Sequence, residues 1–235
     1  MGATPTHPQL LDYLATTFRD DYAGSLKRLH RLIVTSATYR QSSAHNPQYA
    51  ATDGDNRYLW RMNRTRLDAE SVHDAILAIS GQLDLTMGGP SVKQFIETPG
   101  VHATPNADYA NFDPDSPAAR RRSVYRFIFR TVPDPFMQTL DCPDASQLAP
   151  KRETSVTALQ ALAMLHDRFV VRQSEHIAER LKGNLTEQIQ AAYPLILGRP
   201  AEPADVRALL PYVEKHGFAN AVRMLLNSNE FMFVD

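Results

Sequence analysis

The segment from Tyr58 to Ser91 carries the clearest helix signal in the chain and constrains the fold most. Asp68 is suited to cap the N-terminus of a helix, and acidic residues in the first turns interact favourably with the helix dipole. Apolar residues then recur at helical spacing and form one stripe: Val72, Ile76, Ile79 and Leu83. The run from Gly88 to Pro90 ends any helix that reaches it. We therefore predict a helix from about Asp68 to Ser80 at the centre of the fold.

Charged residues gather around the start of this helix. Glu70, His73 and Asp74 are spaced so that their side chains can meet on one helix face. The whole candidate polar network comprises Arg61, Arg64, Arg66, Asp68, Glu70, His73 and Asp74. Our interpretation is structural, because a planar guanidinium binds a carboxylate through two parallel hydrogen bonds. We expect Glu70 to pair with one or more of the three arginines, partly buried, and to dock the Trp60 segment onto the helix.

The Glu70-x-x-His73 spacing also allows a metal-binding interpretation. One Glu-x-x-His motif on a helix supplies half of the protein ligands of a carboxylate-bridged di-iron site. Such a site needs the motif twice, and the chain contains it once. We therefore assign no metal site and keep a metal-binding domain as the weakest functional alternative.

Composition excludes several classes of protein. The 235 residues, 43% of them hydrophobic, can bury a sizeable core. A formal net charge of −1 argues against a generic nucleic-acid or anionic-membrane binder. The single cysteine, Cys142, excludes an internal disulfide and the Cys-x-x-Cys-His motif of covalent haem. No apolar window is long enough to span a bilayer, and the N-terminal residues lack the features of a signal peptide.

Helical patterns dominate the remaining chain. A helix start at Pro8, with Leu10, Leu11, Leu14 and Phe18 on its buried face, precedes a second start at Ser25, and the two helices should pack as a hairpin. The apolar segment 155–165 reads as a central helix. Asn184 with Glu187 predicts a capping box for a later helix, and Pro203 opens another.

The middle of the chain is irregular. It is rich in Pro, Asp, Asn and Ser, and alternating aromatic residues predict one strand from Ser123 to Arg130. The fold class is therefore mainly α, a multi-helix domain with a long irregular middle region and at most a small β element. We expect one domain over 1–235, or two packed lobes at about 1–92 and 151–235 with a loop-rich insert at about 93–150.

Two further features of the middle region suggest chemistry. The basic residues Arg120, Arg121, Arg122 and Arg126 form a candidate anion-binding group for a sulfated or phosphorylated ligand. A solvated or salt-bridged face is the commoner explanation for such a run. Cys142 is a candidate nucleophile, although a lone cysteine is more often a small buried filler. A carboxylate pair for glycoside hydrolysis cannot be identified by spacing, because the fold sets such pairs.

Several sequence motifs are distinctive: HPQLLDYLA (7–15), LHRLIVTSATYRQSS (29–43), LWRMNR (59–64), RLDAE (66–70), GGPS (88–91), RSVY (122–125), TALQAL (157–162) and LNSNEF (226–231). Together they resemble a known family, the C-terminal domain of unknown function in planctomycete cytochrome-c-type proteins. This chain departs from the family at Cys142, usually aromatic or apolar there, at His166, usually Asn, and at Pro194.

The resemblance implies architecture more than chemistry. In the family this domain follows a second uncharacterised domain, and often a haem c segment, in exported proteins. It implies that this chain is the C-terminal piece of a longer protein, which we call the parent protein, and that it is periplasmic or extracellular. It also implies that haem c occurs only in an N-terminal segment that this chain lacks, and that the N-terminal domains of the parent protein are its partners.

Three functions follow as hypotheses. The first is an accessory or interaction domain of such an exported protein. The second is an enzyme, or part of one, that acts on polysaccharide with redox support from the parent's haem segment. The third is the metal-binding domain. A pocket lined by carboxylates or arginines favours the enzyme, and a broad apolar face favours the interaction domain.

Overall fold

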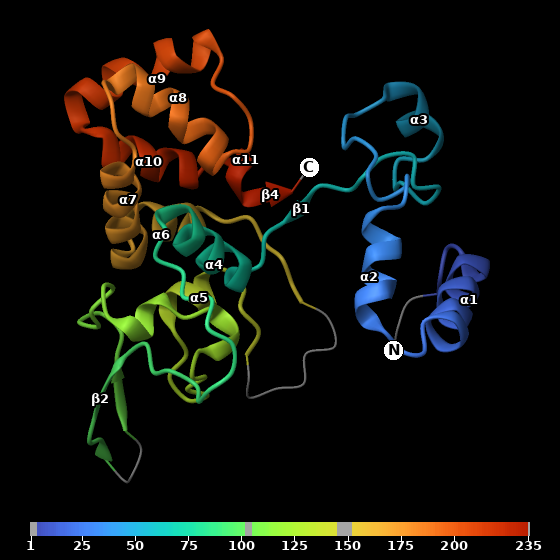
Figure 1. Cartoon of the computed structure of the whole chain (residues 1–235), viewed down its shortest axis with the longest axis horizontal. Helices are drawn as coiled ribbons and strands as arrows, with labels where there is room; N and C mark the ends of the chain where they lie inside the picture. The colour runs from blue at the N-terminus through green and yellow to red at the C-terminus, as the bar shows by residue number, and fades with distance from the viewer. Residues whose placement is uncertain (1–3, 102–104, 145–151, 235) are drawn as a thin grey trace. The chain divides into compact units, whose positions relative to one another are not determined.

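The computed structural model describes residues 4–101, 105–144 and 152–234, and it divides the chain into two compact units (Figure 1). The N-terminal unit ends at Thr65 and the C-terminal unit runs from Arg66 to Val234. The division therefore falls before the predicted central helix and not at the irregular middle region. Within the described residues, no helix combines the length and apolar character needed to cross a membrane.

The N-terminal unit is a small helical layer. It contains α1 (Pro8–Thr16), which continues as the π-helical turn η1 (Thr17–Asp21), then α2 (Leu26–Val34) and α3 (Pro47–Thr52). The helix starts predicted at Pro8 and Ser25 are confirmed, since Pro8 is the first residue of α1 and Ser25 is the N-cap of α2.

The prediction that the apolar face of the first helix is buried is wrong. Leu10 and Leu11 are 46% and 55% exposed, and no apolar side chain between residues 4 and 65 is buried. Among the described residues of this unit, α2 and α3 pack too loosely against α1 to cover the stripe, and a stable core needs at least two packed layers.

The C-terminal unit is built around α4 (Ala69–Ser80), as predicted. Asp68 caps it by accepting a hydrogen bond from the Ser71 backbone N–H, and Gly81 ends it in the left-handed region with φ 77°. Val72, Ile76 and Leu77 are fully buried. They face the core because their spacing places them on one side of the helix.

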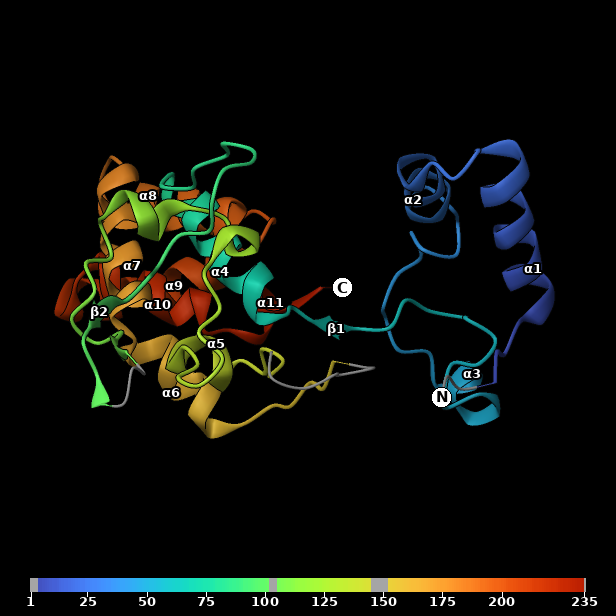
Figure 2. The same ribbon diagram turned by 90° about the horizontal axis from the view of Figure 1, so that it is seen from below.

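The other helices of this unit surround α4. They are α5 (Pro135–Thr139), α6 (Ala158–His166), α7 (Arg168–Arg180), α8 (Leu185–Ile196), α9 (Pro203–His216), α10 (Phe218–Leu226) and α11 (Asn229–Met232). α7 packs against both α4 and α10, and these three helices lie side by side in Figure 1 and in Figure 2. The predicted capping box of Asn184 and Glu187 begins α8, and Pro203 opens α9.

The β structure is small, so the mainly α fold class is confirmed. β2 (Ile96–Thr98) pairs with β3 (Asn106–Asp108) in antiparallel register, with Ile96 opposite Asp108. β1 (Thr65–Arg66) pairs with β4 (Phe233–Val234). Two short 3-10 turns, η3 (Pro117–Arg120) and η4 (Ser123–Tyr125), belong to the irregular region between β3 and α5.

The predicted strand over Ser123–Arg130 is wrong. Its first residues form η4, and its strand-like pairing with the described parts of the chain is limited to an isolated bridge between Arg126 and Val92. The alternating aromatic residues have a different role, because the rings of Phe127 and Phe129 pack around Phe95. The period of two therefore builds an aromatic cluster.

The segment expected to form a central helix is peripheral. α6 buries only Gln160 and Met164, and Leu159 and Leu162 are 69% and 52% exposed. Its composition predicted a helix correctly, but small apolar residues on all sides do not decide which face the rest of the fold covers.

Candidate functional site

The polar centre of the C-terminal unit is formed by His73 and Asp74 on α4 and by Ser123 at the start of η4. His73 Nδ1 lies 3.1 Å from Asp74 Oδ1 and 3.0 Å from Ser123 Oγ. Asp74 Oδ1 also accepts hydrogen bonds from the Ser123 hydroxyl at 2.8 Å and the Ser123 backbone N–H at 2.7 Å. Two residues far apart in sequence are thus joined through one carboxylate oxygen.

The protonation of this centre follows from its burial. His73 is 4% exposed and stacks on Phe169 with the ring centroids 4.5 Å apart. Burial lowers the pKa of His73, so the imidazole is neutral at pH 7. Burial alone would raise the pKa of Asp74, but its hydrogen bonds from His73 and Ser123 outweigh that effect and lower the pKa. Since a carboxylate only accepts, Nδ1 of His73 carries the proton and Nε2 carries the lone pair.

This arrangement is not a serine-nucleophile triad. In such a triad the serine and the aspartate contact different nitrogens of the histidine ring. Here Ser123 and Asp74 contact the same nitrogen, Nδ1. His73 is therefore oriented by Ser123 and Asp74 and does not activate Ser123.

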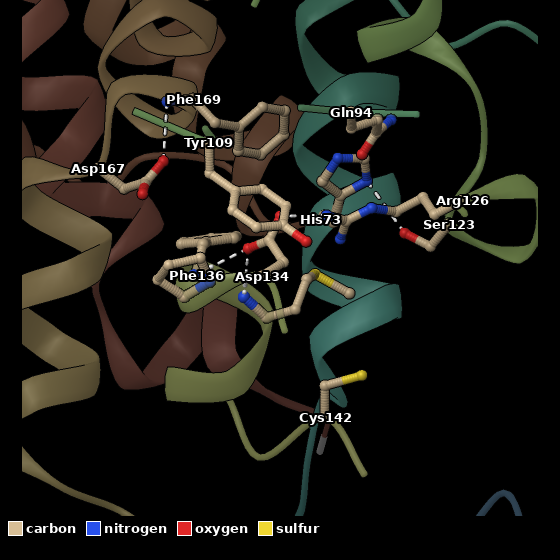
Figure 3. A network of polar contacts seen from close by, with 12 residues as sticks. His73, Gln94, Tyr109, Ser123, Arg126, Asp134, Phe136, Cys142, Asp167 and Phe169 are labelled. Carbon is tan, nitrogen blue, oxygen red and sulfur yellow. Dashed lines mark hydrogen bonds and ion pairs between the residues drawn. The ribbon is translucent and has the colours of Figure 1, made fainter. Parts of the chain in front are cut away.

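An ion pair between Arg126 and Asp134 lies next to this centre (Figure 3). Asp134 is also the N-cap of α5, where its other oxygen accepts hydrogen bonds from the backbone N–H groups of Phe136 at 2.9 Å and Met137 at 3.1 Å. The pair is mostly buried, with side-chain exposures of 11% for Arg126 and 20% for Asp134. The segment after η4 and the N-terminus of α5 thus meet at one carboxylate.

A cavity of about 330 Å³, which we name the His73 cavity, opens on one side of this ion pair. Its lining combines aromatic rings with ionisable groups and one amide: His73, Gln94, Tyr109, Phe112, Arg126, Asp134, Phe136, His166, Asp167, Arg168 and Phe169. The volume is at the lower end of the ~300–1,000 Å³ range of small-molecule sites. It is therefore sized for a small ligand or for one unit of a larger one.

Two acidic groups that line the His73 cavity, those of Tyr109 and Asp167, have raised pKa values, which favours their neutral forms. Burial, and then the charge of Asp134, raise the pKa of Tyr109 to about 12, and its hydroxyl donates to the Val132 carbonyl at 2.8 Å. Burial also raises the pKa of Asp167, although this residue caps α7 through the Phe169 backbone N–H at 2.8 Å. Each carboxylate of the cavity thus has a structural role as a helix cap.

A second cavity of about 310 Å³, the Cys142 cavity, opens on the other side of the ion pair. Its principal lining residues are Glu70, Gln94, Phe95, Tyr109, Arg126, Phe127, Phe129, Asp134, Gln138, Cys142 and Asp144. Four side chains, those of Gln94, Tyr109, Arg126 and Asp134, line both cavities. In Figure 3, Asp134 lies near the centre, with Asp167 to the left, Arg126 to the right and Cys142 below.

The partner of Glu70 is Arg152, which corrects the predicted network. The Glu70 carboxylate accepts from Arg152 through both oxygens, at 2.6 and 2.8 Å, and this pairing lowers the pKa of Glu70. Arg66 instead donates to the Leu140 carbonyl at 3.1 Å and to Asp141 at 2.7 Å. Arg152 reaches Glu70 because its segment, distant in sequence, returns to the start of α4.

Trp60 also has other contacts than predicted. Its indole N–H donates to the Asp53 carbonyl at 2.9 Å, and its ring lies near Tyr49 and under the guanidinium of Arg61. All of these residues belong to the N-terminal unit, so local chain geometry anchors Trp60 without Glu70.

The basic group at 120–126 does not converge on one point. Arg121 donates to the carbonyls of Thr86 and Gly88 at 2.9 and 2.7 Å, and Arg122 contacts Met87. Both guanidinium groups lie over the ring of Tyr125, whereas Arg126 pairs with Asp134. Arg121 and Arg122 therefore hold the loop after α4 in place.

The remaining candidates are distributed between the two cavities. His166 lines the His73 cavity, and Cys142 lies 4.0 Å from Glu70 in the Cys142 cavity. Burial, and then the nearby Glu70, raise the pKa of the Cys142 thiol, which disfavours the nucleophilic thiolate. Within the described residues, no three His, Cys, Asp or Glu side chains form a group that could hold a metal ion.

Sequence reasoning missed most of the cavity walls. Tyr109, Phe112 and Asp167 fall in segments without a motif, and only the fold brings them to α4. Two carboxylates of the walls, Asp134 and Asp167, carried a weak local signal, since each precedes a helix in a position suited to an N-cap.

The N-terminal unit has a groove of its own. It measures about 380 Å³ and is apolar for most of its length, with Leu10, Tyr13 and Leu14 of α1 on one side and Leu32 and Ile33 of α2 on the other. α1 and α2 thus line a common surface, which the exposed apolar face of α1 extends.

Comparison with known proteins places the chain in a family. A family model described as PSD1, protein of unknown function (DUF1553), matches residues 1–213. The chain belongs to this family. No curated protein and no solved structure matches it. The match spans all of the N-terminal unit and most of the C-terminal unit of this DUF1553 chain, including both cavities.

Proposed function

We propose that this DUF1553 chain is an accessory domain of an exported planctomycete cytochrome-c-type protein, and that its C-terminal unit binds a saccharide in the His73 cavity. The first part rests on the motif resemblance, and haem c would belong to a segment of the parent outside this chain. The observation that carries the second part is the lining of the cavity, where aromatic rings surround a charge-balanced set of polar groups.

The charges favour a neutral ligand. Arg126 and Arg168 offset Asp134 and Asp167, and burial keeps His73 neutral. An ionic ligand would meet groups of its own sign, whereas hydroxyl groups can donate to carboxylates and accept from guanidinium groups. A neutral ligand with many hydroxyl groups therefore matches this lining, because its binding does not bury an unpaired charge in the cavity.

The aromatic rings favour a ring-shaped ligand with an apolar face. Phe112, Phe136 and Phe169 supply flat surface, and Tyr109 adds a ring whose hydroxyl is already bonded to Val132. Sugars present C–H groups on their faces and hydroxyl groups at their edges. Ligand sites of this kind combine apolar walls with a few placed polar groups that fix orientation.

Binding of the chain to an array of immobilised neutral glycans, followed by calorimetric titration, tests the saccharide proposal. We expect Phe112→Ala to weaken binding by about tenfold or more, equivalent to about 1.4 kcal/mol. Tyr58→Ala removes an aromatic ring that is 78% exposed and outside both cavities, and it should leave binding unchanged. Absence of binding to every neutral glycan would overturn the proposal.

Hydrolysis of the same ligand is the second candidate. Asp167, whose pKa burial raises, and Asp134 line one cavity, and glycoside hydrolysis uses two carboxyl groups of which one is a proton donor. Asp167→Asn keeps a cap acceptor for α7 and removes the acid. This substitution should abolish the release of reducing ends and preserve saccharide binding. Release by the variant at the rate of the unmutated chain would exclude Asp167 as the acid.

The accessory role also involves the groove of the N-terminal unit. Its exposed apolar lining suits the packing of another protein surface, here the parent's N-terminal domains. Leu10→Asp places a charge in this groove, and Leu11→Asp places it on the same helix outside the groove. If the groove holds the parent's domains, only Leu10→Asp should weaken their association with this chain in analytical ultracentrifugation.

A further inference from the structure

We propose that the saccharide is a chain of several residues that occupies the His73 cavity and the Cys142 cavity together, crossing between them over Arg126 and Asp134. This inference rests on the proposed saccharide binding and specifies the length of the ligand. It assigns the Cys142 cavity as a second set of subsites.

The two cavities share part of their lining. Gln94, Tyr109, Arg126 and Asp134 contribute to both linings, and each of them comes from a different part of the irregular region. Because the same side chains bound both spaces, a ligand that fills one cavity ends against groups that also face the other.

The shared lining contains the mostly buried ion pair. The side chains of Arg126 and Asp134 retain 11% and 20% exposure and line both cavities, so the pair presents polar atoms to each of them. In the proposed complex the ligand passes over these atoms from one cavity to the other. A chain-like ligand can follow this path while its hydroxyl groups bond to the guanidinium and the carboxylate.

The composition of the Cys142 cavity repeats that of the His73 cavity. Three clustered rings, those of Phe95, Phe127 and Phe129, lie on one side, with Phe95 5.7 Å from Phe129 between centroids. Gln138 and Glu70 supply acceptors, and Gln138 a donor, on the other side. Aromatic surface at both ends with a polar crossing between them suits a ligand whose units repeat.

The two volumes support the same conclusion. At about 330 and 310 Å³, each cavity alone is at the lower limit of small-molecule sites. Together they offer space for several linked rings. A single sugar unit would leave one aromatic cluster without a partner.

Calorimetric titration with linear β-1,4-linked oligomers of glucose, mannose and xylose, from one to six units, tests this inference on the full chain. Affinity should rise by about tenfold or more from the shortest oligomer that binds to the tetramer or pentamer, and then level off. Phe112→Ala, in the His73 cavity, should weaken binding at every length.

Phe127→Ala provides the matched variant in the Cys142 cavity. Phe127 is 39% exposed, so its removal leaves the core of the unit in place. It should remove the gain in affinity with length and leave binding of the shortest oligomer unchanged. Gln138→Ala, on the exposed face of α5, gives a second variant with the same expectation and no loss of aromatic packing.

The outcomes separate the two proposals. Equal affinity for short and long oligomers, or loss of short-oligomer binding in Phe127→Ala and Gln138→Ala, would overturn the two-cavity inference and leave saccharide binding standing. No binding of any oligomer, together with no binding on the neutral glycan array, would overturn the saccharide proposal and this inference with it.

Discussion

Glu70 and Arg152 form a two-pronged ion pair whose strength depends on its exposure. The side chains are 32% and 46% exposed, so water screens the attraction, and removal of one partner does not strand a charge in the core. We expect Glu70→Gln to lower the free energy of unfolding by at most about 1 kcal/mol. Urea denaturation measures the shift.

Arg152→Met is the partner control for that substitution. If the pair acts as a unit, the double variant should lose no more than either single variant, because the interaction can be removed only once. A loss of about 3–5 kcal/mol in Glu70→Gln alone would mean that the pair is buried in solution.

His73 makes the stability of the C-terminal unit sensitive to pH. Its pKa in the folded protein is lowered by burial, from an ordinary value of 6.5. Above pH 6.5 the imidazole is neutral in both states, so this contribution to stability is complete. As the pH falls below 6.5 and then through the folded-state pKa, the unfolded state gains a proton first, and stability is lost at up to about 1.4 kcal/mol per pH unit.

Urea midpoints at pH 7.5 and 5.5 measure this effect in the unmutated chain and in His73→Gln. The unmutated chain should lose more stability between the two pH values than the variant, because the glutamine side chain does not titrate. His216→Gln, at the exposed C-terminal end of α9, should behave like the unmutated chain. The same pH dependence in His73→Gln as in the unmutated chain would refute the role of His73.

At the scale of elements, the contact between α4 and α7 contains a buried polar pair. The Ser80 hydroxyl donates to Gln173 Oε1 at 2.7 Å, and Gln173 is 1% exposed with a side-chain N–H₂ that lacks a partner among the described residues. Ser80→Ala removes the hydroxyl group that donates to Gln173 Oε1. We expect it to cost about 1–3 kcal/mol, because a buried group left unsatisfied loses its hydration without compensation.

The double variant Ser80→Ala with Gln173→Met distinguishes hydrogen bonding from packing. Since both polar groups are then absent, most of the lost stability should return. Chemical denaturation measures all three variants. If the double variant were less stable than Ser80→Ala, shape complementarity between the helices and not the hydrogen bond would explain the loss.

The helices were the part of the structure that the sequence predicted best. Asp68, Gly81 and the apolar stripe of α4 are local signals, as are Asn184 with Glu187 and the proline at the start of α9, and local signals decide where helices begin and end. The failures concern burial. Leu10, Leu11 and the outer face of α6 are apolar but exposed, since burial depends on which elements the whole fold brings together.

The candidate site could be predicted only in part. The spacing predicted that Glu70 would meet His73 and Asp74 on one helix face. Instead His73 contacts Asp74, its neighbour in sequence, and the Glu70 carboxylate pairs with Arg152. The partners that complete the site, from Arg152 at Glu70 to Ser123 at Asp74, are 82 and 49 residues away. The alternating rings at 123–130 obey the pattern of a strand but pack as a cluster, since period two describes alternating faces and not hydrogen bonding to a neighbour.

At the scale of the whole molecule, the two units differ in how much apolar surface they bury. Every buried apolar side chain in the described parts of the chain lies between Ala69 and Met232, in the C-terminal unit. Burial of apolar surface is the main favourable contribution to folding. The two units should therefore differ in stability, with the N-terminal unit much the weaker.

Native-state hydrogen exchange tests this difference without cutting the chain. Backbone amides in α4, α7 and α10 should exchange only through global unfolding of their unit, whereas those of α1 and α2 should exchange much faster through local opening. Addition of the parent's N-terminal domains should slow exchange in α1 and α2 if these domains cover the groove at Leu10 and Ile33, and Leu10→Asp should abolish that protection while Leu11→Asp retains it. Exchange as slow in α1 and α2 as in α4, for the chain alone, would show that the N-terminal unit is stable without a partner, and the apolar groove would then need no cover.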